Sequence, residues 1–243
     1  MTETSAATEG PDWSSRAAAW VEHWARLAAP ARRAVADAAG IGPGMRVLDV
    51  GCGSGEFCAL AADRGAAVSG IDAAEGMIAF ARRRLPEADL RVGPMERLPW
   101  PDGAFDVVTG FNAFQFAASF AAALGEARRV TRSGGVVAIC GWGALADRGL
   151  AVVYGALSES APSEPEPYEL ASAGLEPLVA GEVDVPYESP DLATLERAIV
   201  EGAGFEASRE AIEAAAAPFR RPDGSYRFEN RFRYAIARAT SRR

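Results

Sequence analysis

Apolar and polar positions between residues 46 and 140 alternate between two regular patterns. Short apolar runs of strand length are separated by longer runs in which apolar residues recur at helical spacing. The predicted strands are Arg46–Val50, Ala67–Asp72, Leu90–Val92, Phe105–Phe111 and Val136–Cys140. The predicted helices between them are Glu56–Asp63, Ala74–Leu85 and Ser119–Thr131. This alternation indicates an α/β fold with a doubly wound, parallel sheet.

Helical patterns flank this central region on both sides. Asp12–Ala39 reads as helical, and its apolar face consists of Trp13, Ala17, Trp20, Trp24 and Leu27. Further along, the expected elements are a loop at Ala161–Pro167, a helical turn at Tyr168–Ala173, a strand near Glu182–Tyr187, and helices at Asp191–Glu201 and Ala207–Ala217. The last strand, Tyr226–Ala237, is expected at an edge of the sheet, with Phe228, Phe232 and Tyr234 facing the core.

Composition is that of a soluble protein. No apolar run is long enough to cross a bilayer, and the polar N-terminus at Met1–Pro11 is unlike a signal peptide. Cys52, Cys58 and Cys140 have neither the spacing of a metal site nor that of a disulfide framework. We therefore expect a cytoplasmic protein with no membrane partner and no bound metal.

The charged residues restrict both the partners and the chemistry. The net charge of −8 disfavours nucleic acid as a partner, because phosphate binding needs a basic face. Eight arginines in residues 220–243 leave an RNA-binding tail as an alternative. The chain has no lysine and a single histidine, His23. These absences exclude Schiff-base chemistry and argue against catalytic triads and histidine-rich metal sites.

A glycine-rich turn directly follows the first predicted strand. The segment Val47–Gly55 reads VLDVGCGSG, and a helix-compatible run begins at Glu56. Glycine permits a sharp turn and lets a ligand approach the main chain. The N–H groups of the turn and of the helix N-terminus point towards such a ligand. The segment therefore predicts a nucleotide-like cofactor at the carboxyl end of the first strand.

The glycine spacing and two acids narrow the choice of cofactor. In the dinucleotide fingerprint G-x-G-x-x-G the third glycine would stand at residue 56, but here Gly55 comes one residue early and Glu56 takes its place. An acid at this position would repel a pyrophosphate, which disfavours a nicotinamide-dependent oxidoreductase. Asp49 suits a positive group such as an ammonium or a sulfonium, and Asp72 is placed to bind a ribose diol. A ribose and an amino acid without a phosphate indicate S-adenosylmethionine (SAM).

Four segments, in this order, resemble the motifs of class I SAM-dependent methyltransferases of the small-molecule type, related to the ubiquinone and menaquinone biosynthesis methyltransferases. They are Val47–Gly55, Gly70–Asp72 followed by Met77, Gly93–Val108, and Arg128–Gly141. The resemblance extends over residues 41–143 and more loosely to the C-terminus. It implies a Rossmann-like, mostly parallel seven-stranded sheet with an N-terminal helical lid and a helical insertion before the last strand.

The resemblance also implies one methyltransferase domain over residues 1–243. Residues 1–40 would form the lid and 41–143 the cofactor-binding core, while 144–243 would form the substrate side with its insertion at 190–218.

Cofactor contacts are implied by the same resemblance. The residues are Asp49, Gly51, Cys52, Gly53, Gly55, Asp72, Ala73, Met77, Met95, Glu96 and Phe111. The family usually has an acid before Met95 that accepts from the adenine amino group, whereas this chain has Pro94. Either Glu96 or the Met95 N–H is left to bind adenine.

Candidate substrate and catalytic residues come from the N-terminal helix and from the ends of the fourth and fifth strands. The possible aromatic walls of a substrate pocket are Trp20, Trp24 and Trp142, for which core packing is the alternative. Asn112 and Gln115 fall where related enzymes place residues beside the methyl group, and they are candidates for orienting the substrate. His23 is a candidate general base, with a surface histidine as the alternative.

The expected reaction is methyl transfer from SAM to a small aromatic or apolar metabolite. In this family the acceptor is usually a hydroxyl, amine or carbon of a secondary metabolite. Because the sulfonium is already activated, alignment in a dry pocket can supply most of the catalysis. Two alternatives stay open: a SAM-binding enzyme with a non-methylating reaction such as cyclisation, and a SAM-binding accessory protein. The acceptor and a possible homodimer are also left open.

Overall fold

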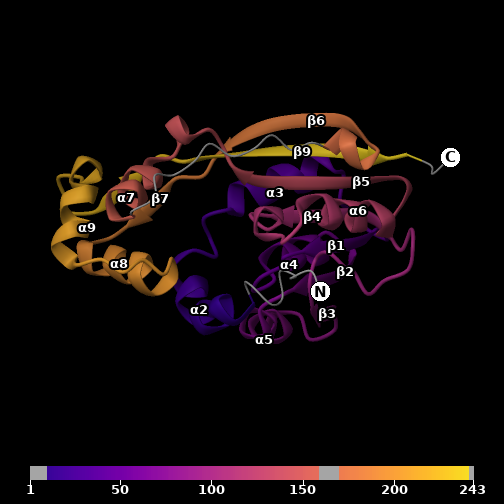
Figure 1. Ribbon diagram of the computed structural model, residues 1–243, viewed down its shortest axis with the longest axis horizontal. Coiled ribbons are helices and arrows are strands. Elements are labelled where there is room, and N and C mark those ends of the chain that lie inside the picture. The colour runs from indigo at the N-terminus through magenta and orange to yellow at the C-terminus, as the bar shows by residue number, and fades with distance from the viewer. Residues whose placement is uncertain (1–9, 159–169, 241–243) are drawn as a thin grey trace.

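The five predicted strands between residues 46 and 140 form the parallel part of a seven-stranded sheet. The computed structural model describes residues 10–158 and 170–240, and its parallel strands are β1 (Arg46–Val50), β2 (Ala67–Asp72), β3 (Asp89–Val92), β4 (Phe105–Phe111) and β5 (Thr131–Trp142). The strand order is β3-β2-β1-β4-β5-β9-β6 (Figure 1). β9 (Arg231–Ala239) pairs antiparallel with both β5 and β6 (Leu175–Asp184). The predicted mostly parallel, Rossmann-like sheet of seven strands is confirmed.

Helices cover both faces of the parallel strands. Val47 of β1 lies in a buried cluster with residues of α3 (Ala29–Ala38) and α4 (Glu56–Asp63). Its neighbour Leu48 lies in the cluster of α6 (Phe120–Val130), on the opposite face. α5 (Glu75–Arg84) packs near α4 around Cys58 and Ile78. Both faces of β1 are therefore buried, which explains its nearly continuous apolar run.

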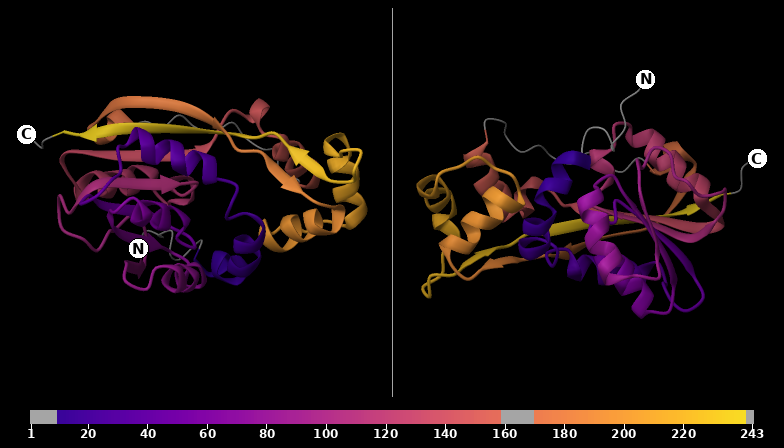
Figure 2. Two further views of the ribbon diagram at one scale, coloured as in Figure 1. Left: turned by 180° about the vertical axis from the view of Figure 1, so that it is seen from behind. Right: turned by 90° about the horizontal axis from the view of Figure 1, so that it is seen from below.

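A second group of elements, which we call the cover, lies at one end of the sheet (Figures 1 and 2). It comprises α7 (Gly149–Leu157), β7 (Tyr187–Ser189), α8 (Leu192–Arg197), a π-helical turn (Ala198–Gly202), α9 (Arg209–Ala216) and β8 (Tyr226–Phe228). The cover has its own buried cluster, which includes Leu195, Ile212 and Phe228. Trp24, which follows α2 (Gly10–His23), is buried in the same cluster. Figure 1 shows α2 between α8 and α5, so this helix connects the cover with the sheet domain.

Short 3-10 helices complete the described chain. They are η1 (Phe114–Phe116), η2 (Leu145–Asp147), η3 (Leu170–Ala173) and η5 (Ala217–Phe219). Within residues 10–158 and 170–240, no helix is both long and apolar enough to cross a membrane. The same residues contain no group of three or more His, Cys, Asp or Glu side chains arranged to hold a metal ion.

The N-terminal helical segment is divided in two. The sequence pattern predicts one helical stretch over Asp12–Ala39, but α2 ends at His23 and α3 begins at Ala29. Pro30 falls in the first turn of α3, where its missing N–H leaves no hydrogen bond unmade. In the interior of a single helix the same proline would remove a backbone hydrogen bond, so the chain breaks before it.

The prediction for the last strand is wrong in two respects. Tyr226–Ala237 forms two strands, β8 and β9, and the Asn230 side chain at the break accepts from the Leu150 N–H at 3.1 Å. β9 also lies inside the sheet, because β6 occupies the edge. The strand expected near Glu182–Tyr187 is the end of β6 and the start of β7. Most of β6 is exposed, and its apolar residues Leu178 and Val179 are adjacent, so it lacks the apolar alternation of a half-buried strand. The predicted loop at Ala161–Pro167 lies outside the described residues.

Candidate cofactor and substrate site

The glycine-rich turn after β1 has three glycines with positive φ, and each meets a different need. Gly51 has a φ of 68°, and a Cβ on it would come within 2.3 Å of the Ala113 Cβ. Gly55 has a φ of 83°, and a Cβ on it would lie 3.1 Å from the Ala81 Cβ on α5. Gly53 has a φ of 53° and open space around the missing Cβ. Gly51 and Gly55 therefore permit close packing, while Gly53 offers bare main chain to a ligand.

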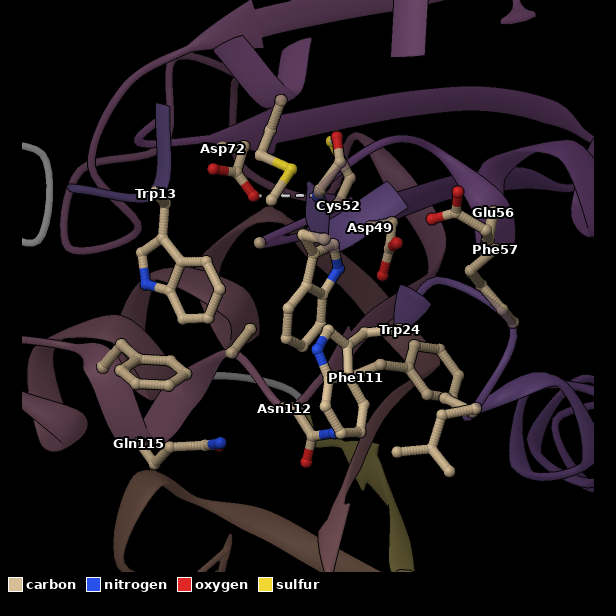
Figure 3. Close-up of a pocket in the computed structure, with 18 of the residues that line it drawn as sticks. Trp13, Trp24, Asp49, Cys52, Glu56, Phe57, Asp72, Phe111, Asn112 and Gln115 are labelled. Atoms are coloured by element: carbon tan, nitrogen blue, oxygen red, sulfur yellow. Dashed lines mark hydrogen bonds between the residues drawn. The ribbon is translucent and has the colours of Figure 1, made fainter. Parts of the chain in front are cut away.

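A cavity of about 530 Å³ lies at the carboxyl ends of β1, β2 and β4. The predicted cofactor residues that line it are Asp49, Gly51, Cys52, Gly53, Asp72, Ala73, Met77, Met95 and Phe111. The predicted substrate and catalytic residues that line it are Trp20, Trp24, Asn112, Gln115 and Trp142. Figure 3 shows Asp72 and Cys52 on one side of the cavity and Asn112 and Gln115 on the other. The structure does not bring Gly55, Glu96 or His23 to the lining.

Asp49, at the end of β1, is a buried carboxylate that faces the cavity. It is 3% exposed and accepts a hydrogen bond from the Thr109 hydroxyl at 2.7 Å. Burial raises the pKa of Asp49 to about 7, and the Thr109 hydrogen bond only partly opposes the shift. A carboxylate that is costly to ionise in this place would be stabilised by a positive ligand group.

Asp72, at the end of β2, holds the glycine-rich turn and the start of α5. Its Oδ2 accepts from the Gly53 N–H at 2.8 Å and its Oδ1 accepts from the Ala74 N–H at 2.9 Å. Burial raises the pKa of the Asp72 carboxyl, and these two hydrogen bonds oppose the shift. Since a carboxylate has about four acceptor positions, Asp72 retains capacity for the two hydroxyls of a ribose.

The two candidates for adenine binding are placed differently. The Glu96 carboxylate accepts from the Ala118 N–H at 2.7 Å, in the segment before α6, and stands outside the cavity lining. Met95 lines the cavity with Met77. Of the two candidates, only Met95 lies at the cavity, so the role of Glu96 toward adenine has no support in this geometry.

The opposite half of the cavity is walled by aromatic pairs. Tyr154 of α7 stacks on Phe205 with ring centroids 4.6 Å apart. Trp142, at the end of β5, meets Phe232 edge to face at 4.8 Å. Trp24 stacks on Tyr187 at 4.5 Å and donates from its indole N–H to the Ala198 carbonyl at 2.8 Å. These contacts hold the rings in fixed orientations around an apolar space.

Asn112 is strained and incompletely hydrogen-bonded. It is the only non-glycine residue with positive φ, 49°, among the described residues. Its backbone N–H donates to the Cys140 carbonyl at 2.8 Å, which fixes the turn after β4. Its buried side-chain Oδ1 has no hydrogen-bond partner within the described part of the chain. Strain and an unmatched polar atom are typical of residues that serve a ligand.

His23 lies away from the cavity, at the end of α2. Its imidazole Nε2 is 3.8 Å from the Glu22 carboxylate, and its side chain is only 5% exposed. His23 as a whole is half-buried with a covered side chain, so it differs from the expected surface histidine, and its role as a general base stays a prediction.

Several lining residues were not assigned from the sequence. They are Trp13, Arg16, Leu27, Arg32, Glu56, Phe57, Phe116, Tyr154, Ala203, Phe205 and Phe232, with Ala28 and Ala113. Trp13 and Arg16 share the helical face of Trp20, so the periodicity of α2 could have indicated them. Tyr154 and Phe205 carry no local signal, because only the packing of the cover brings them to the cavity.

The fold and the site together define a class of protein. A doubly wound sheet, a glycine-rich turn with open main chain, and two buried acids at adjacent strand ends suit a ligand that combines a nucleoside with an amino acid. Residues 48–139 match the family described as "Methyltransferase domain". Residues 48–139 are therefore similar to a methyltransferase domain, and this region carries Asp49 and Asp72.

Comparison with known proteins agrees with this assignment. The chain is 40% identical over 95 residues to malonyl-[acyl-carrier protein] O-methyltransferase of Serratia marcescens, covering 39% of this chain and 37% of that protein. It is 36% identical over 146 residues to demethylmenaquinone methyltransferase of Beutenbergia cavernae, covering 57% and 61% respectively. The matched region thus spans less than two thirds of either relative. In fold, the chain is similar to the [4+2]-cyclase SpnF, with a TM-score of 0.64, 18% identity, and coverage of 99% and 98%.

SAM is the cofactor of this class, and the residues of the site fit it. Gly53 leaves room for close approach of a ligand to the main chain, and Asp49 lacks a cation within ion-pairing distance among the described residues. Asp49 would hold the ammonium group, Asp72 the ribose diol, and Met77 and Met95 the faces of adenine. When bound, SAM supplies a methyl group on a positively charged sulfur.

Proposed function

We propose that this protein transfers a methyl group from SAM to a small, largely apolar aromatic metabolite. The single observation that carries the proposal is that one cavity joins the cofactor residues at the ends of β1 and β2 with an aromatic half closed by the cover. The acceptor gains the methyl group and releases one proton, which leaves S-adenosylhomocysteine as the second product.

The side chains of the acceptor half support this substrate class. Trp24, Trp142 and Tyr154 offer flat apolar surfaces, which favour an aromatic acceptor and exclude water from the reacting atoms. Asn112 and Gln115 are the polar side chains that would orient the acceptor, and the unpartnered Asn112 Oδ1 would accept from its hydroxyl or amine. Orientation of this kind can lower a reaction barrier substantially without a general base.

The names of the relatives are consistent with small acceptors but differ among themselves. One relative is named for a malonyl group on a carrier protein and another for a demethylmenaquinone. The aromatic lining favours an acceptor closer in character to a quinone than to a malonyl group. Location in the cytoplasm and a role in secondary metabolism belong to the same proposal.

The test is incubation of the purified protein with methyl-labelled SAM and a panel of phenols, quinols and aromatic amines. We expect label in a product that is one methyl group heavier than its acceptor, together with S-adenosylhomocysteine. Calorimetry should show binding of SAM and S-adenosylhomocysteine and none of NAD. Binding of NAD without binding of SAM would contradict the proposal.

A non-methylating reaction is the second candidate, because the structural relative that covers 99% of this chain is named a cyclase. Such a reaction would change the acceptor without adding mass and without consuming SAM. Product mass and cofactor turnover, measured in one assay, separate the two candidates.

A further inference from the structure

Arg32 of α3 is a half-buried cation that lines the cavity. Its Nη1 donates to the Ala25 carbonyl at 2.6 Å, which is its one hydrogen bond in the described part of the chain. Within the same residues Arg32 has no ion pair. Burial lowers the pKa of its guanidinium, although Glu56 and Asp49 oppose the shift. A buried guanidinium costs free energy unless an anion and further acceptors satisfy its donors.

The acids around Arg32 are engaged elsewhere. The Glu56 carboxylate accepts from the Ser54 hydroxyl at 2.7 Å and pairs with Arg84 at 3.0 Å. The Asp49 carboxylate accepts from Thr109. Since a guanidinium carries five N–H donors in a planar fork, Arg32 retains donors for a planar anion in the cavity.

We propose that Arg32 binds the carboxylate of the methionine part of SAM. This inference rests on SAM as the cofactor of the proposed function. The ammonium and the carboxylate of an amino acid are attached to one carbon, so their binding groups must be neighbours. Asp49 fits the ammonium, and Arg32 and Asp49 line the same cavity, where each charge opposes the effect of burial on the pKa of the other.

The other arginine of the lining, Arg16, already pairs with Asp12 and donates to the Ala203 carbonyl. The acids of the lining, Asp49, Glu56 and Asp72, would repel a carboxylate.

The acceptor is the alternative source of a carboxylate. Arg32 lies on α3, which packs through Ala36 against α4 and through Val35 against β5 and β9. The charges that act on its guanidinium are those of Glu56 and Asp49, at the start of α4 and in β1. The residues that wall the acceptor half come mainly from α2, β5, β9 and the cover. The position of Arg32 therefore favours the cofactor as the source.

Calorimetry with two ligands tests the proposal. One ligand is S-adenosylhomocysteine, and the other is its decarboxylated form, which keeps the ammonium, the thioether, the ribose and the adenine. Wild-type protein is expected to bind the complete ligand about 10- to 100-fold more tightly, because a charge-assisted hydrogen bond contributes about that much. In Arg32→Gln the complete ligand should bind only as tightly as the decarboxylated ligand. The affinity of the decarboxylated ligand should differ less than about threefold between the variant and the wild type.

The matched control is Arg33→Gln, which removes an exposed arginine from the next position of α3 and should leave both affinities unchanged. Thermal unfolding of Arg32→Gln shows whether the variant folds, and Arg32→Lys, which keeps the charge but not the fork, should give an intermediate preference.

Equal weakening of both ligands in Arg32→Gln would overturn the proposal and make Arg32 a packing residue. Unchanged affinity for both ligands, combined with a raised KM for the acceptor, would overturn it in favour of an acceptor carboxylate. Failure of the wild type to bind either ligand would instead refute the cofactor assignment itself.

Discussion

The two ends of the cavity are built in opposite ways. The cofactor end takes Asp49, Gly53 and Asp72 from two consecutive strands and the turn between them, and its lining is rich in acids. The acceptor end takes Tyr154 and Phe205 from the cover, and its lining is aromatic. Recognition at the first end is electrostatic and local in the sequence. Recognition at the second end depends on shape and on tertiary packing.

This difference gives each end its own experimental signature. Substitutions at the cofactor end should change the affinity for SAM and its dependence on pH. Substitutions at the acceptor end should change the turnover rate or the KM for the acceptor while leaving the affinity for S-adenosylhomocysteine intact. A variant that changes both the affinity for S-adenosylhomocysteine and the turnover rate would show that the two ends are not independent.

The largest effect is expected for Asp49→Asn. Loss of the charge that pairs with the ammonium in a buried place should weaken SAM binding by roughly 10²- to 10³-fold, within the range of about 2–5 kcal/mol for a broken buried charge pair. The asparagine can still accept from Thr109, so the fold should be retained. Titration calorimetry measures the affinity, and affinity within threefold of the wild type would show that Asp49 does not face the ammonium.

The same variant should stabilise the ligand-free protein at neutral and alkaline pH. The pKa of Asp49 is raised to about 7 in the folded protein. The free energy of unfolding therefore falls as the pH rises above the pKa of Asp49 in the unfolded chain, and it levels off above pH 7. Removing the ionisable group should raise the free energy of unfolding at pH 8 by up to roughly 4 kcal/mol and change little near pH 4. Urea denaturation at both pH values measures this gain, and equal stability of wild type and variant at pH 8 would contradict it.

The sequence predicted the local structure of the cofactor end because its determinants are contiguous. Strand, turn and helix in Val47–Asp63 follow from apolar runs and glycines, and the adjacent strands bring Asp49 and Asp72 to one edge of the sheet. It failed where long-range packing decides. The interior position of β9 depends on the exposed strand β6, and the contribution of Tyr154 depends on the docking of α7. Arg32 was not predicted as a site residue, because the sequence pattern could not show that α3 places it at the cavity.

At the acceptor end, the next largest effect is expected for Asn112→Ala. The unpartnered Oδ1 is placed to orient the acceptor, so its loss should lower kcat by about 10²-fold through misalignment. Affinity for S-adenosylhomocysteine should stay within threefold, which calorimetry on the same preparation checks. Asn112→Gly, which relieves the positive φ, separates loss of the amide from changes in the backbone. An equal loss of cofactor affinity would place Asn112 at the cofactor end instead.

The pH dependence of cofactor binding is expected to be smaller and confined to the cofactor end. SAM should bind the ionised form of Asp49, so its affinity should be level above pH 7 and fall by up to about tenfold per unit below it. Burial is the main cause of the raised pKa of Asp49; Thr109 and Arg32 lower it, and Asp72 and Glu56 raise it further. Calorimetry from pH 5.5 to about 8.5 gives the profile. Asp49→Asn should abolish the slope, whereas a slope that persists in this variant would assign it to another group, such as Asp72.

The smallest effect is expected for His23→Ala, although His23 is the only histidine of the chain. The imidazole lies beside Glu22 and is buried outside the cavity lining, so it cannot reach a proton on a bound acceptor. We expect kcat to change less than about threefold and its pH profile near neutrality to keep its shape, since a positioned acid–base group would contribute about 10²–10⁴. The melting temperature should fall instead, because a covered side chain is truncated near the junction of α2 and the cover. A fall in kcat of a hundredfold with unchanged stability would restore His23 as the base and require α2 to move when the acceptor binds.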